Sequence, residues 1–138
     1  MKINKVNEKI SVAPQITAND VSEIAQLGYK SLICNRPDGE EPSQPLYSDI
    51  KAQAQEHGLD IVHIPVQGSD ITEADINEFK ESLDSLPGPL LAYCRTGTRS
   101  IILWSLSNPD SLSVDEIIRK AASAGYDLSA LVERLDSR

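Results

Sequence analysis

The chain has 138 residues, of which 40% are hydrophobic and 25% are charged. This length and composition fit one globular domain over residues 1–138 and exclude a disordered or low-complexity chain. Asp and Glu outnumber Lys and Arg by 21 to 13, giving a net charge of −8, so neither nucleic acid nor a membrane surface is an expected partner. No apolar stretch approaches the ~20 residues of a membrane span. The first residues lack the apolar core of a signal peptide, and we expect a cytoplasmic protein.

Strand-like segments alternate with helical ones along the chain. Four short strands are expected, at residues 9–13, 31–34, 60–64 and 89–93. The second and the fourth are almost continuously apolar, which is typical of strands covered by helices on both faces. The segment 35–45 contains three prolines and a glycine, which exclude regular structure and predict a long loop within the domain.

Helices are expected after the strands. Residue pairs with the spacing of a capping box precede three of the helical patterns, namely Thr17 with Asp20, Thr72 with Asp75, and Ser113 with Glu116. Further helices are expected over 47–57 and around 128–135, and Gly28 and Gly58 stand where helices should end. This alternation predicts an α/β fold with a mainly parallel sheet of four to five strands, flanked by helices.

The segment 90–104 contains the strongest functional signal. An apolar strand leads directly into Cys94, and a short loop with Gly97 and Arg99 precedes an apolar helix. The N–H groups of such a loop and of a helix N-terminus converge on one point and favour a bound anion. The same field and Arg99 favour the thiolate of Cys94, so we predict that Cys94 is a nucleophile and that Arg99 holds the anion. The alternative is that Cys94 is a small buried residue at a strand end.

Six further residues are candidates for binding the anion: Arg36, Arg95, Thr96, Gly97, Thr98 and Ser100. Three of them have an equally plain structural interpretation. Arg95 is then a solvated loop residue, Ser100 caps the following helix, and Arg36 pairs with an acidic residue of its own loop. The few cysteines and histidines are too scattered to predict a metal site or a disulfide framework, and no cofactor is expected.

The sequence Cys-Arg-Thr-Gly-Thr-Arg-Ser at 94–100 resembles the active-site loop of rhodanese-type sulfurtransferases and, less closely, that of cysteine-dependent phosphatases. Wider stretches resemble the phosphatase-like domain of beta-lactamase-hydrolase-like proteins, at residues 11–17, 33–41, 91–104 and 114–118. The resemblance covers nearly the whole chain. It implies a compact fold like that of the dual-specificity phosphatases, and association with enzymes that oxidise sulfide and persulfide.

The length of the loop separates two possible reactions. Four residues, 95–98, lie between Cys94 and Arg99, one fewer than in the cysteine phosphatases, which also have a histidine where this chain has Tyr93. A shorter ring of N–H groups favours a single sulfane sulfur over a phosphoryl group. Ester hydrolysis also needs a general acid. Asp70 is the candidate, although an Asp just before Thr72 is as readily a loop or cap residue.

The sequence therefore favours a sulfurtransferase. The Cys94 thiolate would take a sulfane sulfur from thiosulfate or a persulfide, and the resulting persulfide would pass it to a thiol such as glutathione. The first alternative is a phosphomonoesterase that works through a phosphocysteine, and the second is a binding module for anions without catalysis. Cys34 ends a neighbouring parallel strand and is either a resolving thiol near Cys94 or a buried packing residue.

Overall fold

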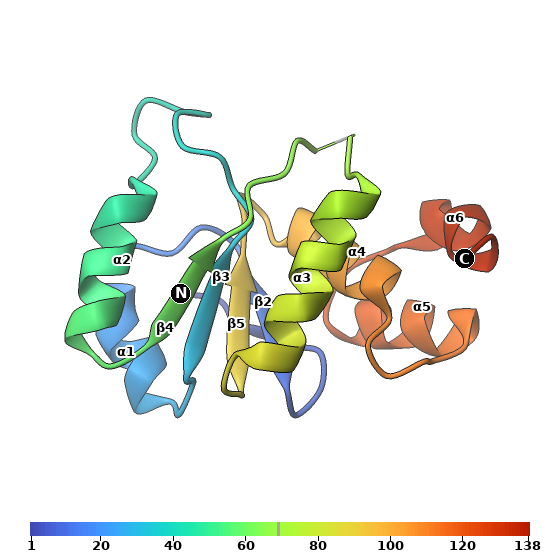
Figure 1. The fold of residues 1–138 in the computed structure, drawn as a ribbon, viewed down its shortest axis with the longest axis horizontal. Coiled ribbons are helices and arrows are strands. Elements are labelled where there is room, and N and C mark those ends of the chain that lie inside the picture. The colour runs from blue at the N-terminus through green and yellow to red at the C-terminus, as the bar shows by residue number, and fades with distance from the viewer. Residues whose placement is uncertain (69) are drawn as a thin grey trace.

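The computed structural model describes residues 1–68 and 70–138, and a five-stranded sheet lies at its centre (Figure 1). The strands are β1 (Asn4–Lys5), β2 (Ile10–Ala13), β3 (Ser31–Cys34), β4 (Asp60–His63) and β5 (Leu90–Tyr93). Their order is β1-β2-β5-β3-β4. Strand β1 is antiparallel to β2, and the other pairs are parallel. The four predicted strands are confirmed, and β1 is an addition too short to leave a sequence pattern.

Helices cover both faces of the sheet, as predicted. The structure has α1 (Asp20–Gln26), α2 (Tyr47–Glu56), α3 (Glu73–Ser85), α4 (Thr98–Ser107), α5 (Val114–Ser123), a short 3-10 helix (Ser129–Leu131) and α6 (Val132–Asp136). Figure 1 shows α1 and α2 on one face, α3 and α4 on the other, and α5 and α6 outside α4. The predicted α/β class is confirmed, and the helical pattern at 128–135 corresponds to the 3-10 helix and α6 together.

Local signals at the helix ends explain where several helices begin and stop. Thr72 with Asp75, and Ser113 with Glu116, form reciprocal capping boxes at the start of α3 and α5. Thr17 and Asp20 exchange the same two hydrogen bonds just ahead of α1. These side chains satisfy N–H groups that the first turn of a helix leaves without an intrahelical partner.

Two apolar clusters hold the helices against the sheet. One includes Val12, Ile33 and Ala92 with side chains of α3 to α6. The other includes Leu32 and Leu91 with side chains of α1 and α2. Successive residues of a strand point to opposite faces, so each central strand contributes to both clusters. No helix in the described part of the chain is long and apolar enough to cross a membrane.

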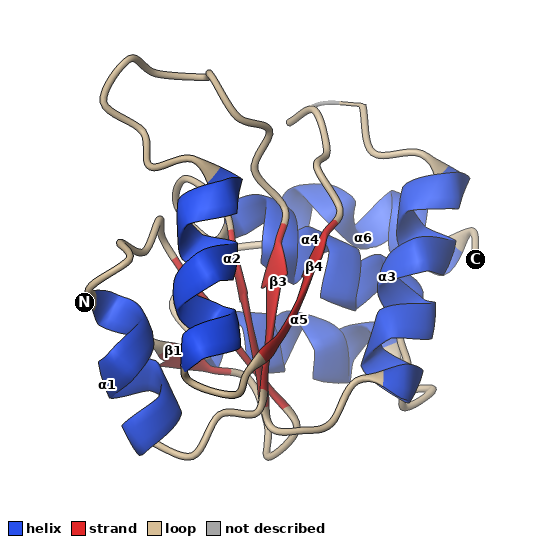
Figure 2. Cartoon of the chain, turned by 60° about the vertical axis from the view of Figure 1, so that its left-hand side comes forward, coloured by secondary structure: helices blue, strands red, loops and turns tan. Residues whose placement is uncertain are grey.

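The loops that follow β3, β4 and β5 leave the sheet at one end, which is the carboxyl end of the parallel strands (Figure 2). The loop between β3 and α2 is the long proline-containing segment that the sequence predicted. Ligands of parallel α/β sheets bind at this end. The topology therefore brings segments around residues 36–41, 66–68 and 94–99 to one edge of the molecule.

Candidate active site

Cys94 directly follows β5, and its side chain is fully buried, with 0% of its surface exposed. The backbone N–H of Gly97 donates a hydrogen bond to the Cys94 sulfur at 3.1 Å. The N–H of Cys94 itself donates to the carbonyl oxygen of Ala13 on β2, at 3.4 Å. The sulfur is thus buried like a packing residue, but it meets the inward-facing N–H that a nucleophile requires.

Gly97 is the N-cap residue of α4 and has a backbone conformation that suits glycine. Its φ is +91°, in the left-handed region that costs other residues free energy. A Cβ on Gly97 would overlap the hydroxyl of Tyr126. That hydroxyl donates a hydrogen bond to the carbonyl oxygen of Thr96, at 3.0 Å. Only glycine therefore fits between the sulfur of Cys94 and the ring of Tyr126.

Arg99 lies in the first turn of α4, and the chain's own acceptors fix its guanidinium group. Its Nη1 and Nη2 atoms donate to the two carboxylate oxygens of Glu40, at 2.8 and 2.9 Å. Nη1 also donates to the carbonyl oxygen of Val66, at 3.0 Å. The hydrogen bond with Glu40, with a smaller contribution from the nearby Cys94 thiol, raises the pKa of Arg99 above its usual value.

These contacts leave one edge of the Arg99 guanidinium for a ligand. They use three of its five N–H bonds. Among residues 1–68 and 70–138, no oxygen accepts from the other two, on Nε and Nη2. Those two N–H bonds lie parallel on one edge, the arrangement with which arginine binds two oxygens of a phosphate or a carboxylate.

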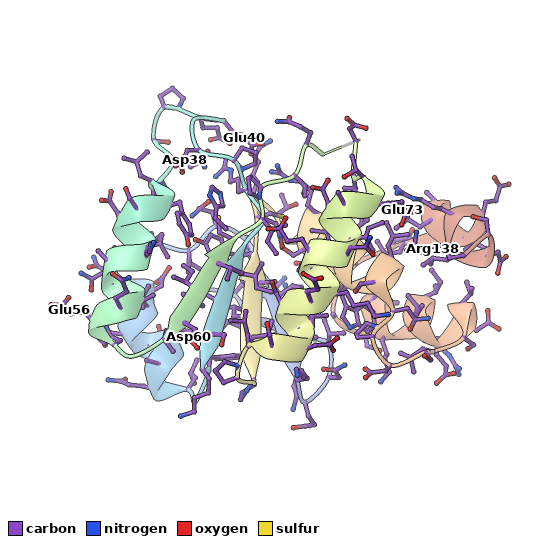
Figure 3. All side chains as sticks on the ribbon, in the orientation of Figure 1. Asp38, Glu40, Glu56, Asp60, Glu73 and Arg138 are labelled. Atoms are coloured by element: carbon purple, nitrogen blue, oxygen red, sulfur yellow. The ribbon has the colours of Figure 1, made fainter. Side chains whose placement is uncertain are left out.

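An ionic cluster surrounds Arg99. Glu40, on the loop between β3 and α2 (Figure 3), accepts from Nε of Arg36 as well, at 2.9 Å. Glu41 accepts from Arg36 at 3.1 Å and from Arg95 at 2.9 Å. The hydrogen bond from Arg99, followed by that from Arg36, lowers the pKa of the Glu40 carboxyl to about 2. Glu40 is therefore a fixed negative charge at neutral pH.

Arg36 and Arg95 differ in what they offer a ligand. Arg36 is 3% exposed, and its third nitrogen donates to the side-chain oxygen of Gln15 at 3.2 Å. Its guanidinium thus braces the loop, which is the structural interpretation. Arg95 has a side chain 66% exposed that pairs with Glu41. Binding of an anion by either arginine stays a prediction.

The three hydroxyl residues of the loop also differ. Thr96 and Thr98 are exposed, and their hydroxyls are 3.0 Å apart. Ser100 is buried, and its hydroxyl donates to the side-chain oxygen of Asn35, at 2.8 Å. Asn35 in turn donates to the carbonyl oxygen of Ile64, at 3.0 Å. Ser100 thus links α4 to the segments after β3 and β4, and a contact with an anion stays a prediction for all three.

An open pocket extends over this edge of the sheet. Its lining combines the ionic cluster with the outer side of the Cys94 loop and consists of Arg36, Glu40, Glu41, Gly68, Arg95, Thr96, Thr98, Arg99 and Ile102. Cys94 is fully buried and is not itself a lining residue, but residues of the loop that follows it are. A substrate would therefore approach the sulfur through a mouth that carries both arginines and carboxylates.

Cys34 and Asp70 are the two remaining candidates. Cys34 ends β3, is paired in register with Tyr93 and is therefore one position from Cys94 across the sheet. Both cysteines are free thiols. Burial raises the pKa of the Cys34 thiol, which donates to the carbonyl oxygen of Arg36 at 3.4 Å. Asp70 is exposed on the loop after β4, close in sequence to Gly68 of the pocket, and within the described residues its carboxylate has no hydrogen bond to the Cys94 loop.

Sequence reasoning did not find three residues that shape this site. Tyr126 bonds to the Cys94 loop, Asn4 bonds to the Tyr126 hydroxyl, and Val66 contributes only a backbone oxygen to Arg99. One interpretation of Arg36 paired it with Asp38, Glu40 or Glu41, and the structure pairs it with Glu40 and Glu41. The pairing of Glu40 with Arg99 was not expected. The contacts of Arg99, Tyr126 and Asn4 have no local sequence signal, because each joins segments that only the fold brings together.

Comparison with known proteins identifies relatives over almost the entire chain. Residues 2–111 match the family model of the beta-lactamase hydrolase-like protein, phosphatase-like domain. Beta-lactamase hydrolase-like proteins are 37% identical over 134 residues in Xylella fastidiosa strain Temecula1 and 36% identical over 138 residues in Agrobacterium fabrum. These matches cover 96% and 99% of this chain. The chain spans about a third of the length of these relatives, 31% and 32%.

Solved structures show the same fold. A candidate phosphatase from Neisseria meningitidis is 44% identical, with a TM-score of 0.89 over 99% of this chain and 98% of that one. The core catalytic domain of the PP-IP phosphatase SIW14 from S. cerevisiae is 18% identical, with a TM-score of 0.73 over 97% of this chain and 83% of that one. The second likeness concerns the fold alone, and it confirms the expected phosphatase-like architecture.

Proposed function

Because this chain belongs to the family of phosphatase-like domains of beta-lactamase hydrolase-like proteins, we propose that it is a cysteine-dependent hydrolase of phosphomonoesters. The observation that best supports this proposal is the hydrogen bond from the Gly97 N–H to the Cys94 sulfur, together with the edge of Arg99 that Glu40 leaves for a ligand. The 44% identical candidate phosphatase supports the same class. The sequence alone ranks sulfur transfer above hydrolysis of phosphomonoesters, and this proposal reverses that ranking.

The reaction has two displacements at phosphorus. The Cys94 thiolate attacks the phosphorus atom, the bond from phosphorus to the ester oxygen breaks, and the alcohol leaves with a proton from a general acid. Water then attacks the phosphocysteine and gives a proton back to the same carboxylate, the sulfur–phosphorus bond breaks, and inorganic phosphate and the thiolate are released. The Arg99 edge and the loop N–H groups would hold the phosphoryl oxygens, whose charge both steps redistribute.

Asp70 is the proposed general acid. It is exposed on the loop after β4, which also contributes Gly68 to the pocket and the Val66 oxygen to Arg99. Glu40 is less suited, because its lowered pKa keeps it deprotonated at neutral pH.

Sulfur transfer is the second candidate, and one observation favours it. Within the described residues, Gly97 contributes the one backbone N–H bonded to the Cys94 sulfur, and the loop is a residue shorter than in cysteine phosphatases. A single sulfane sulfur on Cys94 needs fewer donors than a phosphoryl group with three oxygens. This reaction would use thiosulfate or a persulfide as donor and a thiol such as glutathione as acceptor, and it needs no contribution from Asp70.

One comparison of two assays tests the proposal. Hydrolysis of p-nitrophenyl phosphate and sulfur transfer from thiosulfate to glutathione are measured for the wild type, for Cys94→Ser and for Cys34→Ser. We expect phosphate release that falls to the uncatalysed rate in Cys94→Ser, because an alcohol is a far weaker nucleophile than a thiolate. Cys34→Ser is the matched control and should keep most of the activity, since the buried Cys34 thiol bonds to the carbonyl oxygen of Arg36 and, within the described residues, accepts no hydrogen bond from a loop N–H.

The other outcomes are equally informative. Sulfur transfer without phosphate release, with one added sulfur found on Cys94 by mass spectrometry, would establish the second candidate instead. Retention of inorganic phosphate binding in both variants, with turnover in neither assay of the wild type, would identify a binding module. Equal loss of activity in Cys34→Ser would assign Cys34 a role in the reaction that the proposal does not include.

A further inference from the structure

The peptide group between Thr96 and Gly97 connects the Cys94 sulfur to the C-terminal part of the chain. Its N–H donates to the sulfur at 3.1 Å, and its carbonyl oxygen accepts from the Tyr126 hydroxyl at 3.0 Å. We propose that Tyr126 is a positioning residue that holds this peptide group with its N–H directed at the Cys94 sulfur. The role rests on the proposed function insofar as that N–H serves the thiolate and the bound anion.

Planarity of the peptide group makes the two contacts dependent on each other. In a trans peptide, the C=O and N–H bonds point in opposite directions. An acceptor bond that holds the Thr96 carbonyl outward therefore turns the Gly97 N–H inward. Gly97 has no side chain to restrict its rotation, and its φ of +91° is accessible chiefly to glycine. Within the described residues Tyr126 is the one donor to the Thr96 carbonyl, so without its hydroxyl only the contact of the Gly97 N–H with the sulfur would orient this peptide group.

A second hydrogen bond orients the Tyr126 hydroxyl. Nδ2 of Asn4, on β1, donates to the hydroxyl oxygen at 3.0 Å, so the hydroxyl proton is left to point at the Thr96 carbonyl. Burial raises the pKa of Tyr126 above its ordinary value, and the hydroxyl remains a donor at neutral pH. The three hydrogen bonds therefore all donate in the same direction: from Asn4 to Tyr126, from Tyr126 to the Thr96 carbonyl, and from the Gly97 N–H to the Cys94 sulfur.

Tyr126 lies outside the part of the chain that carries the Cys94 motif. It follows α5 and stands beyond residue 111, where the match to the family model ends. The Tyr126 hydroxyl packs directly against Gly97, because it occupies the space that a Cβ of Gly97 would need. Within the described residues the Tyr126 hydroxyl bonds to Asn4 and to the Thr96 carbonyl, and no hydrogen bond joins it to the sulfur or to Arg99, so its effect would pass through the peptide group.

The test is the hydrogen exchange of the Gly97 amide, measured by NMR on the full chain. In Tyr126→Phe the ring stays and the hydroxyl is lost. We expect the protection of the Gly97 amide, relative to that of Ala92 in β5, to fall about fivefold, which corresponds to one net hydrogen bond. Tyr29→Phe is the matched control. It removes a tyrosine hydroxyl that donates to Ser11 at 2.8 Å, away from the loop, and should leave the ratio unchanged.

Two results would overturn the assignment. One is an unchanged ratio of Gly97 to Ala92 protection in Tyr126→Phe, and the other is an equal fall in Tyr29→Phe. Binding of inorganic phosphate provides the separate readout for function, and we expect its affinity to fall about fivefold in Tyr126→Phe. If phosphate fails to bind the wild type, the proposed function fails, while the exchange ratio still decides the role of Tyr126.

Discussion

At the scale of single residues, the pairing of Arg99 with Glu40 determines what the site offers an anion. The Glu40 carboxylate accepts hydrogen bonds from Nη1 and Nη2 of Arg99 and leaves the edge formed by Nε and Nη2 for a ligand. A bidentate pair of this kind fixes orientation as well as charge. Glu40 therefore acts on a substrate through Arg99, although its own charge repels an anion.

We expect Glu40→Gln to lower kcat/KM for p-nitrophenyl phosphate about tenfold, because charge-assisted hydrogen bonds contribute about 1.5–3 kcal/mol and the guanidinium would lose its fixed orientation. Glu41→Gln is the matched control. It removes a carboxylate that pairs with Arg36 and Arg95 but not with Arg99, and its effect should be smaller than threefold or so. A rise in kcat/KM for Glu40→Gln would instead mean that Glu40 competes with the substrate for Arg99.

Residues of the site were predictable from the sequence where the signal is local. Cys94, Gly97 and Arg99 lie within six positions that join a strand to a helix, and the physical meaning of that pattern does not depend on the rest of the fold. The partners of Arg99 were not predictable in this way. Glu40 is 59 positions away, and which carboxylate reaches which arginine depends on the path of an irregular loop.

At the scale of elements, the start of α4 is the most constrained junction in the site. Gly97 combines a left-handed backbone with a close approach of the Tyr126 hydroxyl. Gly28, after α1, has a similar φ of +99° but no atom within 4 Å of the position of a Cβ. A substitution at Gly28 therefore measures the cost of the left-handed backbone alone, and one at Gly97 measures that cost plus the steric overlap.

We expect Gly28→Ala to lower the free energy of unfolding by about 1–2 kcal/mol, which is the cost of a left-handed residue. Gly97→Ala should lower it by about 1–3 kcal/mol more, since the methyl group must displace Tyr126 or the loop. Urea unfolding of both variants measures the difference. Equal losses in the two variants would show that the contact with Tyr126 adds no constraint at Gly97.

The order of strands and helices could be predicted from the sequence because its signals are local. Two of the three capping-box pairs, those at Thr72 and Ser113, lie directly at helix starts, and the apolar strands could be placed by their composition. Strand β1 could not be predicted, because two residues contain no alternation. Its Asn4 nevertheless contacts Tyr126, so an element without a pattern contributes to the site.

At the scale of the whole molecule, the ionic cluster ties the loop after β3 to α4 and to the loop after β4. Glu40 is its centre, with bonds to Arg36 and Arg99. The hydrogen bond from Arg99 lowers the pKa of Glu40 from 4.5 to about 2. A carboxyl whose pKa is lower in the folded state stabilises that state above its unfolded pKa, and the contribution disappears as the pH falls through the folded pKa.

We therefore expect the difference in unfolding free energy between wild type and Glu40→Gln to be constant from pH 5 to pH 8, both above the unfolded value of 4.5. It should shrink as the pH falls from 4.5 and be largely lost near pH 2, where Glu40 is half protonated in the folded chain. Urea unfolding at a series of pH values measures this. A difference that persists unchanged at pH 2 would mean that the charge of Glu40 is not what connects the loops.

The position of Tyr126 has a consequence for how a domain of this kind is cut or grafted. A fragment ended at residue 111, where the family match ends, would keep the cysteine and both loop arginines. It would discard the hydroxyl on the Thr96 carbonyl and the bond from Arg134 to the carbonyl oxygen of Ile71. Engineers who transplant the motif, or trim the chain to its recognisable part, should carry residues 112–138 along with it.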